Sequence, residues 1–301
     1  MTRMHLLVGG LNCESLADLP HLARLSARGR SGPVEAGTSA ALARLFGVDI
    51  GDLAAIALAA EGADPGADTW FHADPVHLLA GMHSLTLFDG RQFDIQADES
   101  AALLATLNRH FDGEIEFLAP HPARWYARFK RTPEVDMAPL DQVAGSVVSP
   151  DLIAGPDAKE LQRTSTEIQM LLYTHPVNEA REERNEATVN GLWFWGGGRY
   201  RQPAAQFDQV MADDFHTRAL AAAAGIRSMP LPARLDRLPD GRTLAVLDRR
   251  HAEQHDEDWF APLLHGLQKG HAEAVELTLT GRPATRHVID RWRSLRFWLN
   301  R

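Results

Sequence analysis

The strongest constraint on the fold is a short aromatic run that ends in glycines. Residues 190–199 read Asn-Gly-Leu-Trp-Phe-Trp-Gly-Gly-Gly-Arg. The large apolar residues predict a buried strand, and the glycines predict a loop whose backbone bends tightly or approaches a neighbour closely. Such a loop can present backbone N–H groups to a phosphate or carboxylate. Two interpretations stay open, an anion-binding loop and a strand end that needs backbone freedom, because no complete phosphate-loop motif is present.

Apolar patterns elsewhere predict an α/β core. A strand is expected at residues 5–8, ending at Gly9 and Gly10, followed by helices over 19–29 and 39–46. A strand, a glycine turn and a helix in this order are typical of the start of an α/β domain. Further core elements are expected at 207–224 (helix), 243–247 (strand), 258–267 (helix), 274–280 (strand) and 284–301 (amphipathic helix).

From residue 69 the pattern changes to short strands with fewer helices. Strands are predicted at 69–73, 84–88, 114–118 and 125–130, and helices at 100–111 and 159–173. This composition favours a small inserted α+β subdomain over 63–185. The core domain is then discontinuous, over 1–62 and 186–301.

Charge and cysteine content narrow the class of protein. Forty acidic against 31 basic residues give a formal net charge of -9, which argues against general nucleic-acid binding. A single cysteine excludes an internal disulfide framework and suits a reducing compartment. The start of the sequence has only a short apolar run, so neither a signal peptide nor a membrane span is expected. We therefore expect a cytoplasmic protein.

The basic amphipathic segment at 284–301 has two interpretations. A helix with Arg on one side and aromatic residues on the other can lie on a membrane or bind a partner. A terminal helix that packs its aromatic stripe on the sheet is the common alternative.

Several side chains are candidates for chemistry. His72, Asp74 and His77 are metal-ligand types close in sequence, but Pro75 interrupts their spacing and fixes no ligand geometry, so capped loop histidines are the favoured interpretation and a metal site is the alternative. Thr38 stands at a predicted helix start, where a hydroxyl serves as a cap or as a nucleophile or phosphate contact.

A second set of polar residues surrounds the aromatic run. An Arg and an Asn brought to the glycines would form an anion pocket, whereas ion pairs at the surface are the alternative. The predicted ligand-binding residues are Asn178, Arg181, Asn190, Gly196, Gly197, Gly198 and Arg199.

The combination of these segments resembles a known family. Residues 174–181 (Thr-His-Pro-Val-Asn-Glu-Ala-Arg) followed by 190–198 are similar to the segment of archaeal-type cofactor-independent phosphoglycerate mutases in which an Arg and an Asn precede a Leu-Trp-Gly-x-Gly loop. Residues 6–10, 19–29 and 37–47 resemble their first strand, first helix and nucleophile segment. With residues 70–78 and 122–126 included, the pattern is similar to bacterial RpfE-type regulatory proteins, which are phosphoglycerate-mutase-like.

The resemblance implies an alkaline-phosphatase-like α/β core, a mainly parallel sheet flanked by helices, with an inserted α+β subdomain. Catalytic members of the family use two divalent metals. Their nucleophilic Ser corresponds to Thr38, the Asp next to it to Ser39, and their first Asp ligand to Gly9. Their Asp-His ligand motif has no counterpart, because the sequence contains no Asp-His dipeptide.

Two hypotheses follow. In the first, the chain has lost the two-metal phosphoryl-transfer site, needs no cofactor, and is a regulatory protein that binds an anion such as a small phosphorylated metabolite, with a protein partner left open. In the second, it is an active mutase or phosphatase dependent on Mn²⁺ or Zn²⁺. Thr38 would then be the nucleophile, and His72, Asp74 and His77 would bind the metal.

Overall fold

The computed structural model describes residues 2–81, 85–90, 93–148, 152–204 and 206–295. The chain divides into two compact units: Met1–Val48 with Gln202–Arg301, called the core unit, and Asp49–Arg201, called the inserted unit. The predicted boundaries at 63 and 185 differ from these. The reason is that helix α3 (Leu53–Ala60) and strand β10 (Gly191–Gly198) belong to the inserted unit, whereas the predicted bounds placed both of these segments in the core.

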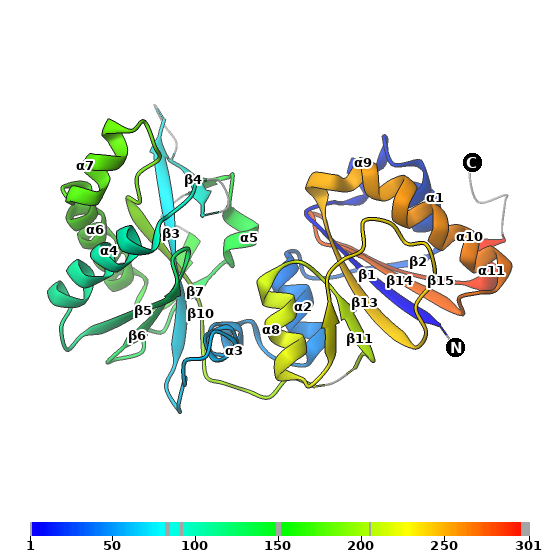
Figure 1. Ribbon diagram of the computed structural model, residues 1–301, viewed down its shortest axis with the longest axis horizontal. Helices are drawn as coiled ribbons and strands as arrows, with labels where there is room; N and C mark the ends of the chain where they lie inside the picture. Colours follow the sequence, from blue (N-terminus) through cyan, green and yellow to red (C-terminus); the bar gives the residue numbers. More distant parts are fainter. Residues whose placement is uncertain (1, 82–84, 91–92, 149–151, 205, 296–301) are drawn as a thin grey trace. The chain divides into compact units, whose positions relative to one another are not determined.

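The core unit is built on a mainly parallel sheet (Figure 1). Its strands are β1 (Arg3–Gly9), β2 (Arg30–Pro33), β11 (Gln209–Met211), β12 (Arg227–Met229), β13 (Arg242–Asp248), β14 (Ala274–Leu279) and β15 (Thr285–Asp290). They lie in the order β12-β11-β13-β1-β14-β15-β2. The pairs from β12 to β14 are parallel, whereas β15 is antiparallel to both β14 and β2.

Helices lie on both faces of this sheet, with α1 and α10 on one face and α2 and α8 on the other (Figure 1). The core-unit helices are α1 (Pro20–Arg28), α2 (Thr38–Phe46), α8 (Phe215–Ala223), α9 (Ala252–His255), α10 (Ala261–Lys269) and α11 (Arg291–Ser294). Central strands covered on both faces must be apolar throughout, which explains the continuous apolar run of β1. Leu6 and Val8 of β1 share a buried cluster with Leu22 of α1, Trp259 and Leu263.

The inserted unit contains an antiparallel sheet in the order β5-β6-β3-β4-β8, with β10 paired to β3. Its strands are β3 (Trp70–Ala80), β4 (Leu85–Asp89), β5 (Ile115–His121), β6 (Arg124–Phe129), β7 (Asp136–Met137), β8 (Val147–Val148), β9 (Ile153–Ala154) and β10. Its helices are α3, α4 (Ala97–His110), α5 (Leu140–Val143), α6 (Ala158–Tyr173) and α7 (Pro176–Glu183). Ser84, the predicted start of a strand, lies outside the described residues.

Two predicted helices of the core unit are wrong in part. Residues 207–224 contain strand β11 before helix α8, and residues 284–294 contain strand β15 before helix α11. In β15 the buried residues are His287 and Ile289, so burial follows the two-residue period of a strand. Residues 296–301 of the predicted helix lie outside the described residues. In the described part of the chain, every helix is too short or too polar to cross a membrane.

Candidate functional site

The carboxyl edge of the core sheet brings together the residues predicted around the nucleophile position. Strands β1 and β13 end side by side at Gly9 and Asp248, and β14 ends just before Thr280. The backbone N–H of Gly37 donates to the Thr280 carbonyl at 3.0 Å, which fixes the start of α2 at this edge. In parallel sheets, ligands bind outside the carboxyl ends of the strands, so this is the leading candidate site.

A pair of threonine hydroxyls lies at its centre. Thr38 Oγ1 is 3.2 Å from Thr280 Oγ1, which also accepts the Gly10 N–H at 3.0 Å. A Cβ on Gly9 would lie 3.2 Å from Thr38 Oγ1, so the absence of a side chain there lets the hydroxyl approach β1. The Arg249 side chain lies over Gly10. The edge therefore presents hydroxyls, a guanidinium and the amino end of α2, where the helix dipole favours an anion.

The donor set at this edge does not fit two divalent metals. At this edge Asp248, at the end of β13, accepts hydrogen bonds from the backbone and guanidinium of Arg250. Asp213 and Asp214, which follow β11, accept the backbone N–H groups of Leu231 and Thr217. Gly9 has no side chain, and the neighbouring threonines offer neutral hydroxyls. A pair of Mn²⁺ or Zn²⁺ ions needs several carboxylates and imidazoles that converge. The ligand atoms of His251 and His255 do not form such a group with Asp248.

The glycines after the aromatic run lie within strand β10 itself, so the predicted loop is wrong. Gly196 and Gly197 have φ angles of 79° and 100°, and a β-bulge shifts the pairing with β3 between Gly196 and Gly198. A Cβ on Gly197 would lie 2.3 Å from the Phe71 ring, and one on Gly198 would lie 2.5 Å from the Gly51 carbonyl carbon. The protein's own atoms therefore fill the space around these glycines. Arg199 follows the strand and is exposed.

The two predicted asparagines bind the protein backbone. The Asn178 amide donates to the carbonyls of Leu172 and Val189 at 2.7 and 2.9 Å and accepts the Val189 N–H at 2.9 Å. The Asn190 amide accepts from the Leu78 N–H at 2.7 Å and donates to the Leu78 carbonyl at 2.9 Å. Both side chains complete backbone hydrogen bonding at the ends of elements. An anion that bound them would have to replace these contacts.

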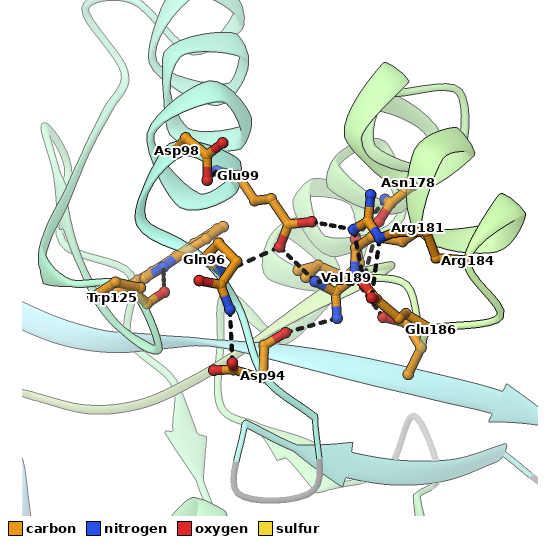
Figure 2. Close-up of polar contacts among 12 residues, drawn as sticks. Asp94, Gln96, Asp98, Glu99, Trp125, Asn178, Arg181, Arg184, Glu186 and Val189 are labelled. Atoms are coloured by element: carbon orange, nitrogen blue, oxygen red, sulfur yellow. Dashed lines mark hydrogen bonds and ion pairs between the residues drawn. The ribbon is translucent and has the colours of Figure 1, made fainter.

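Arg181 is the centre of a buried polar network between α7 and the start of α4 (Figure 2). Its side chain is 2% exposed and donates to the carbonyls of Ala187 and Asp94 at 2.7 and 2.8 Å. It also donates to Glu99 Oε2 at 2.5 Å, and Arg184 donates to Glu99 Oε1 at 2.7 Å. Both guanidiniums thus share one carboxylate. All three nitrogens of Arg181 bind the protein itself.

A pocket of about 820 Å³ lies beside this network. Its lining includes four carboxylates, those of Asp94, Asp98, Glu99 and Glu186, against the guanidiniums of Arg181 and Arg184. Hydrogen bonds to Glu186 and then to Glu99 raise the pKa of Arg184, and the bond from Arg184 lowers the pKa of Glu186. The positive charges are therefore already paired. An added anion would face an excess of negative charge, so the predicted anion site is electrostatically disfavoured here.

The structure does not bring the three metal candidates together. His72 and Asp74 lie on one face of β3, and strand alternation puts His77 on the other. The buried His72 ring stacks on Trp195 with ring centroids 4.1 Å apart, and Trp195 donates its indole N–H to Asp74 at 2.6 Å. His77 Nδ1 lies 2.9 Å from the Thr188 carbonyl. These residues thus form part of the packing of the inserted sheet.

Sequence reasoning missed one other group of ligand-type residues. Within the described part of the chain, His21, Asp256 and Glu257 form the only set of this kind whose ligand atoms all lie within 4.8 Å of one another. Asp256 accepts the backbone N–H groups of His21 and Leu22 at 3.0 and 2.9 Å. The carboxylate is therefore explained as a cap for α1 supplied from a distant segment. No local sequence signal connects the two segments.

Comparisons with known proteins find only distant structural similarity. No protein family and no curated protein matches the chain. A solved cofactor-independent phosphoglycerate mutase from Thermoplasma acidophilum aligns at 14% identity with a TM-score of 0.43, over 96% of this chain and 89% of that chain. The PH0037 protein from Pyrococcus horikoshii aligns at 14% identity with a TM-score of 0.46, over 96% and 87%. At these values a functional conclusion has to come from the chain's own residues.

Proposed function

We propose that the chain binds a small phosphorylated metabolite or a similar anion at the carboxyl edge of the core sheet and acts as a cytoplasmic regulatory protein without transferring phosphate. One observation carries the proposal. The Thr38 hydroxyl stands at the amino end of α2, 3.2 Å from the Thr280 hydroxyl, at an edge whose described side chains do not form a two-metal ligand set.

The electrostatics of the edge support an anionic ligand. The first turn of α2 begins at Thr38, and its N-cap residue is Gly37, which has no side chain to cap the N–H groups of that turn. The helix dipole and the Arg249 guanidinium add positive potential on the same edge. Phosphate oxygens accept hydrogen bonds from hydroxyls and backbone N–H groups, which are the groups present.

Catalysis is a different requirement from binding. Phosphoryl transfer depends on cations that neutralise the charge of the transferring group and activate the nucleophile. A threonine hydroxyl without such help is a weak nucleophile. The resemblance of residues 37–47 and 174–181 to phosphoglycerate mutases, together with residues 70–78 and 122–126, supports the proposal of a relation to RpfE-type regulatory proteins, which are phosphoglycerate-mutase-like.

An active metal-dependent mutase or phosphatase is the second candidate. The position of Thr38 favours it, because a hydroxyl at a helix start beyond the carboxyl edge of a parallel sheet is where such an enzyme needs its nucleophile. This candidate requires Mn²⁺ or Zn²⁺ bound by residues outside the strand ends described above. The metal content of the purified protein and its mutase and phosphatase turnover in added Mn²⁺ distinguish the two.

Ligand binding is tested by thermal unfolding of the full chain with inorganic phosphate and with 3-phosphoglycerate. A ligand at 100 times its Kd stabilises a protein by about 2.7 kcal/mol, which raises Tm by several degrees. We expect this rise in the wild type and its loss in Thr38→Val and Thr280→Val. Thr166→Val is the matched control, since Thr166 is exposed on α6.

The proposal is rejected if neither anion stabilises the wild type, or if Thr38→Val leaves the stabilisation unchanged. Two bound metal ions together with turnover that Thr38→Val abolishes would establish the enzyme instead.

A further inference from the structure

Helix α11 presents the most exposed large apolar side chain among the described residues. Trp292, the second residue of this helix, is 77% exposed. A single exposed ring is common on protein surfaces and indicates nothing by itself. Its surroundings therefore decide whether the ring belongs to a binding surface.

Basic side chains gather around this ring. Arg291 and Arg293 precede and follow it on α11. Helices α10 and α11 lie side by side (Figure 1), and the Arg291 guanidinium lies against Gly270, the residue that follows Lys269 at the end of α10. Two helix ends thus bring exposed positive charge to the same place as the tryptophan.

Helix α1 adds a buried guanidinium to this region. Arg28 is 5% exposed, and its Nη1 donates to the Ser294 carbonyl at the end of α11 across 2.7 Å. Its Nε has no hydrogen-bond partner. Burial and then the nearby Arg24 lower the pKa of Arg28, but an arginine remains charged at pH 7. A buried charge is ordinarily paired with an opposite one, so the charge of Arg28 calls for an anion.

We call this region the basic end of the core unit, and it contains Arg24, Arg28, Lys269, Arg291, Trp292 and Arg293. Asp290 Oδ2 lies 3.5 Å from Arg293 Nε. Among the described residues, none of the other four cations forms an ion pair with a carboxylate. The sequence has the same bias, because residues 291–301 contain four arginines, three aromatic residues and no acidic residue, in a chain with a net charge of -9. Positive charge is therefore concentrated here without compensation.

We propose that the basic end of the core unit docks on an anionic phospholipid surface, with Trp292 at the headgroup boundary and the basic side chains on headgroup phosphates. Guanidiniums bind phosphate oxygens in pairs, and a tryptophan ring is stable where an apolar phase meets water. An anionic membrane offers both environments over its whole surface. The surface uses none of the residues of the proposed anion site at the core edge, so each of the two proposals stands or falls separately.

The test is sedimentation of the full chain with vesicles. Vesicles of phosphatidylglycerol and phosphatidylcholine in equal parts should bind the chain, whereas vesicles of phosphatidylcholine alone should not. High salt should release the chain, because exposed charges are screened. Arg24→Gln and Arg291→Gln should each weaken binding about fivefold, the contribution of one basic residue near an anionic surface. Trp292→Ser should weaken it about tenfold, through the loss of buried apolar area.

Two exposed residues elsewhere supply matched controls. Tyr173 is 75% exposed on α6 of the inserted unit, and the Arg237 side chain is 86% exposed in the segment before β13. Tyr173→Ser removes an equally exposed aromatic ring, and Arg237→Gln changes the net charge as Arg291→Gln does. Both variants should bind as the wild type does. Equal binding to the two kinds of vesicle, or equal losses in Trp292→Ser and Tyr173→Ser, would overturn the proposal.

Discussion

Replacement of Arg181 by Met should cost the inserted unit a large part of its stability. The guanidinium is 2% exposed, and its nitrogens donate to two backbone carbonyls and to Glu99, whose side chain is 11% exposed. Methionine fills a similar volume but donates nothing. Glu99 would keep Arg184 as its partner, yet the nearly buried carboxylate would lose its shortest contact. Removal of one partner from a buried ion pair costs about 3–5 kcal/mol in the free energy of unfolding.

Urea unfolding followed by tryptophan fluorescence measures this loss, since Trp193 and Trp195 lie in the same unit. With a urea dependence of about 2 kcal/mol per molar, the midpoint for that unit should fall by about 2 M. Arg184→Met is the matched control: it removes the same charge from the same pocket, but its side chain is 47% exposed. Its midpoint should move far less. Equal shifts for the two variants, or a shift below about 0.5 M for Arg181→Met, would refute the assignment of Arg181 to a structural role.

Two further predictions concern the two units separately. Burial lowers the pKa of His5 to about 4, so between pH 6.5 and about pH 4 the unfolded chain binds a proton that the folded chain does not. The free energy of unfolding should therefore decrease as the pH is lowered from 6.5 to 4, by at most about 3 kcal/mol. Urea unfolding at each pH measures this decrease, which should be smaller in His5→Gln. Gly197→Ala should destabilise the inserted unit by several kcal/mol, because the new Cβ would lie 2.3 Å from Phe71 at a φ of +100°. Gly62→Ala, at a φ of +87° with open space around it, should cost only about 1–2 kcal/mol by thermal or urea unfolding; similar losses in both would contradict the packing argument.

Sequence periodicity predicted those elements whose burial has a regular pattern. The apolar run of β1 and the helical spacing of α1 and α4 are confirmed by the structure. Helix α3 was missed because its sequence, Leu-Ala-Ala-Ile-Ala-Leu-Ala-Ala, is apolar on every side and has no amphipathic period. Residues 285–290 form strand β15 and not the predicted helix, because Val288, Trp292 and Leu295 also fit a helical spacing and only the pairing with β14 and β2 decides between the two.

The sequence indicates which residues are candidates for a site, but it does not indicate what each of them contacts in the fold. The glycines after the aromatic run were expected to leave room for a ligand, yet Phe71 and Gly51 occupy that room from positions far away in the sequence. The contact between Arg28 and Ser294 joins residues at opposite ends of the chain. Local patterns carry no information about such pairs, since they arise only when the sheet assembles.

The two sets of predicted site residues differ in what the fold requires of them. In the inserted unit, Asn178, Arg181 and Asn190 satisfy buried backbone groups, so folding alone explains why these residue types stand there. At the core edge, the Thr38 hydroxyl lies 3.2 Å from the Thr280 hydroxyl. Thr38 is half-buried, and the Thr280 hydroxyl beside it already accepts the Gly10 N–H, so an alanine at 38 would leave that contact in place. The hydroxyl stands at the amino end of a helix and the carboxyl edge of a parallel sheet, which is where the proposed anion would bind. Binding experiments therefore discriminate best when they vary Thr38 and Thr280, because substitutions at Asn178 or Arg181 would remove stability and binding together.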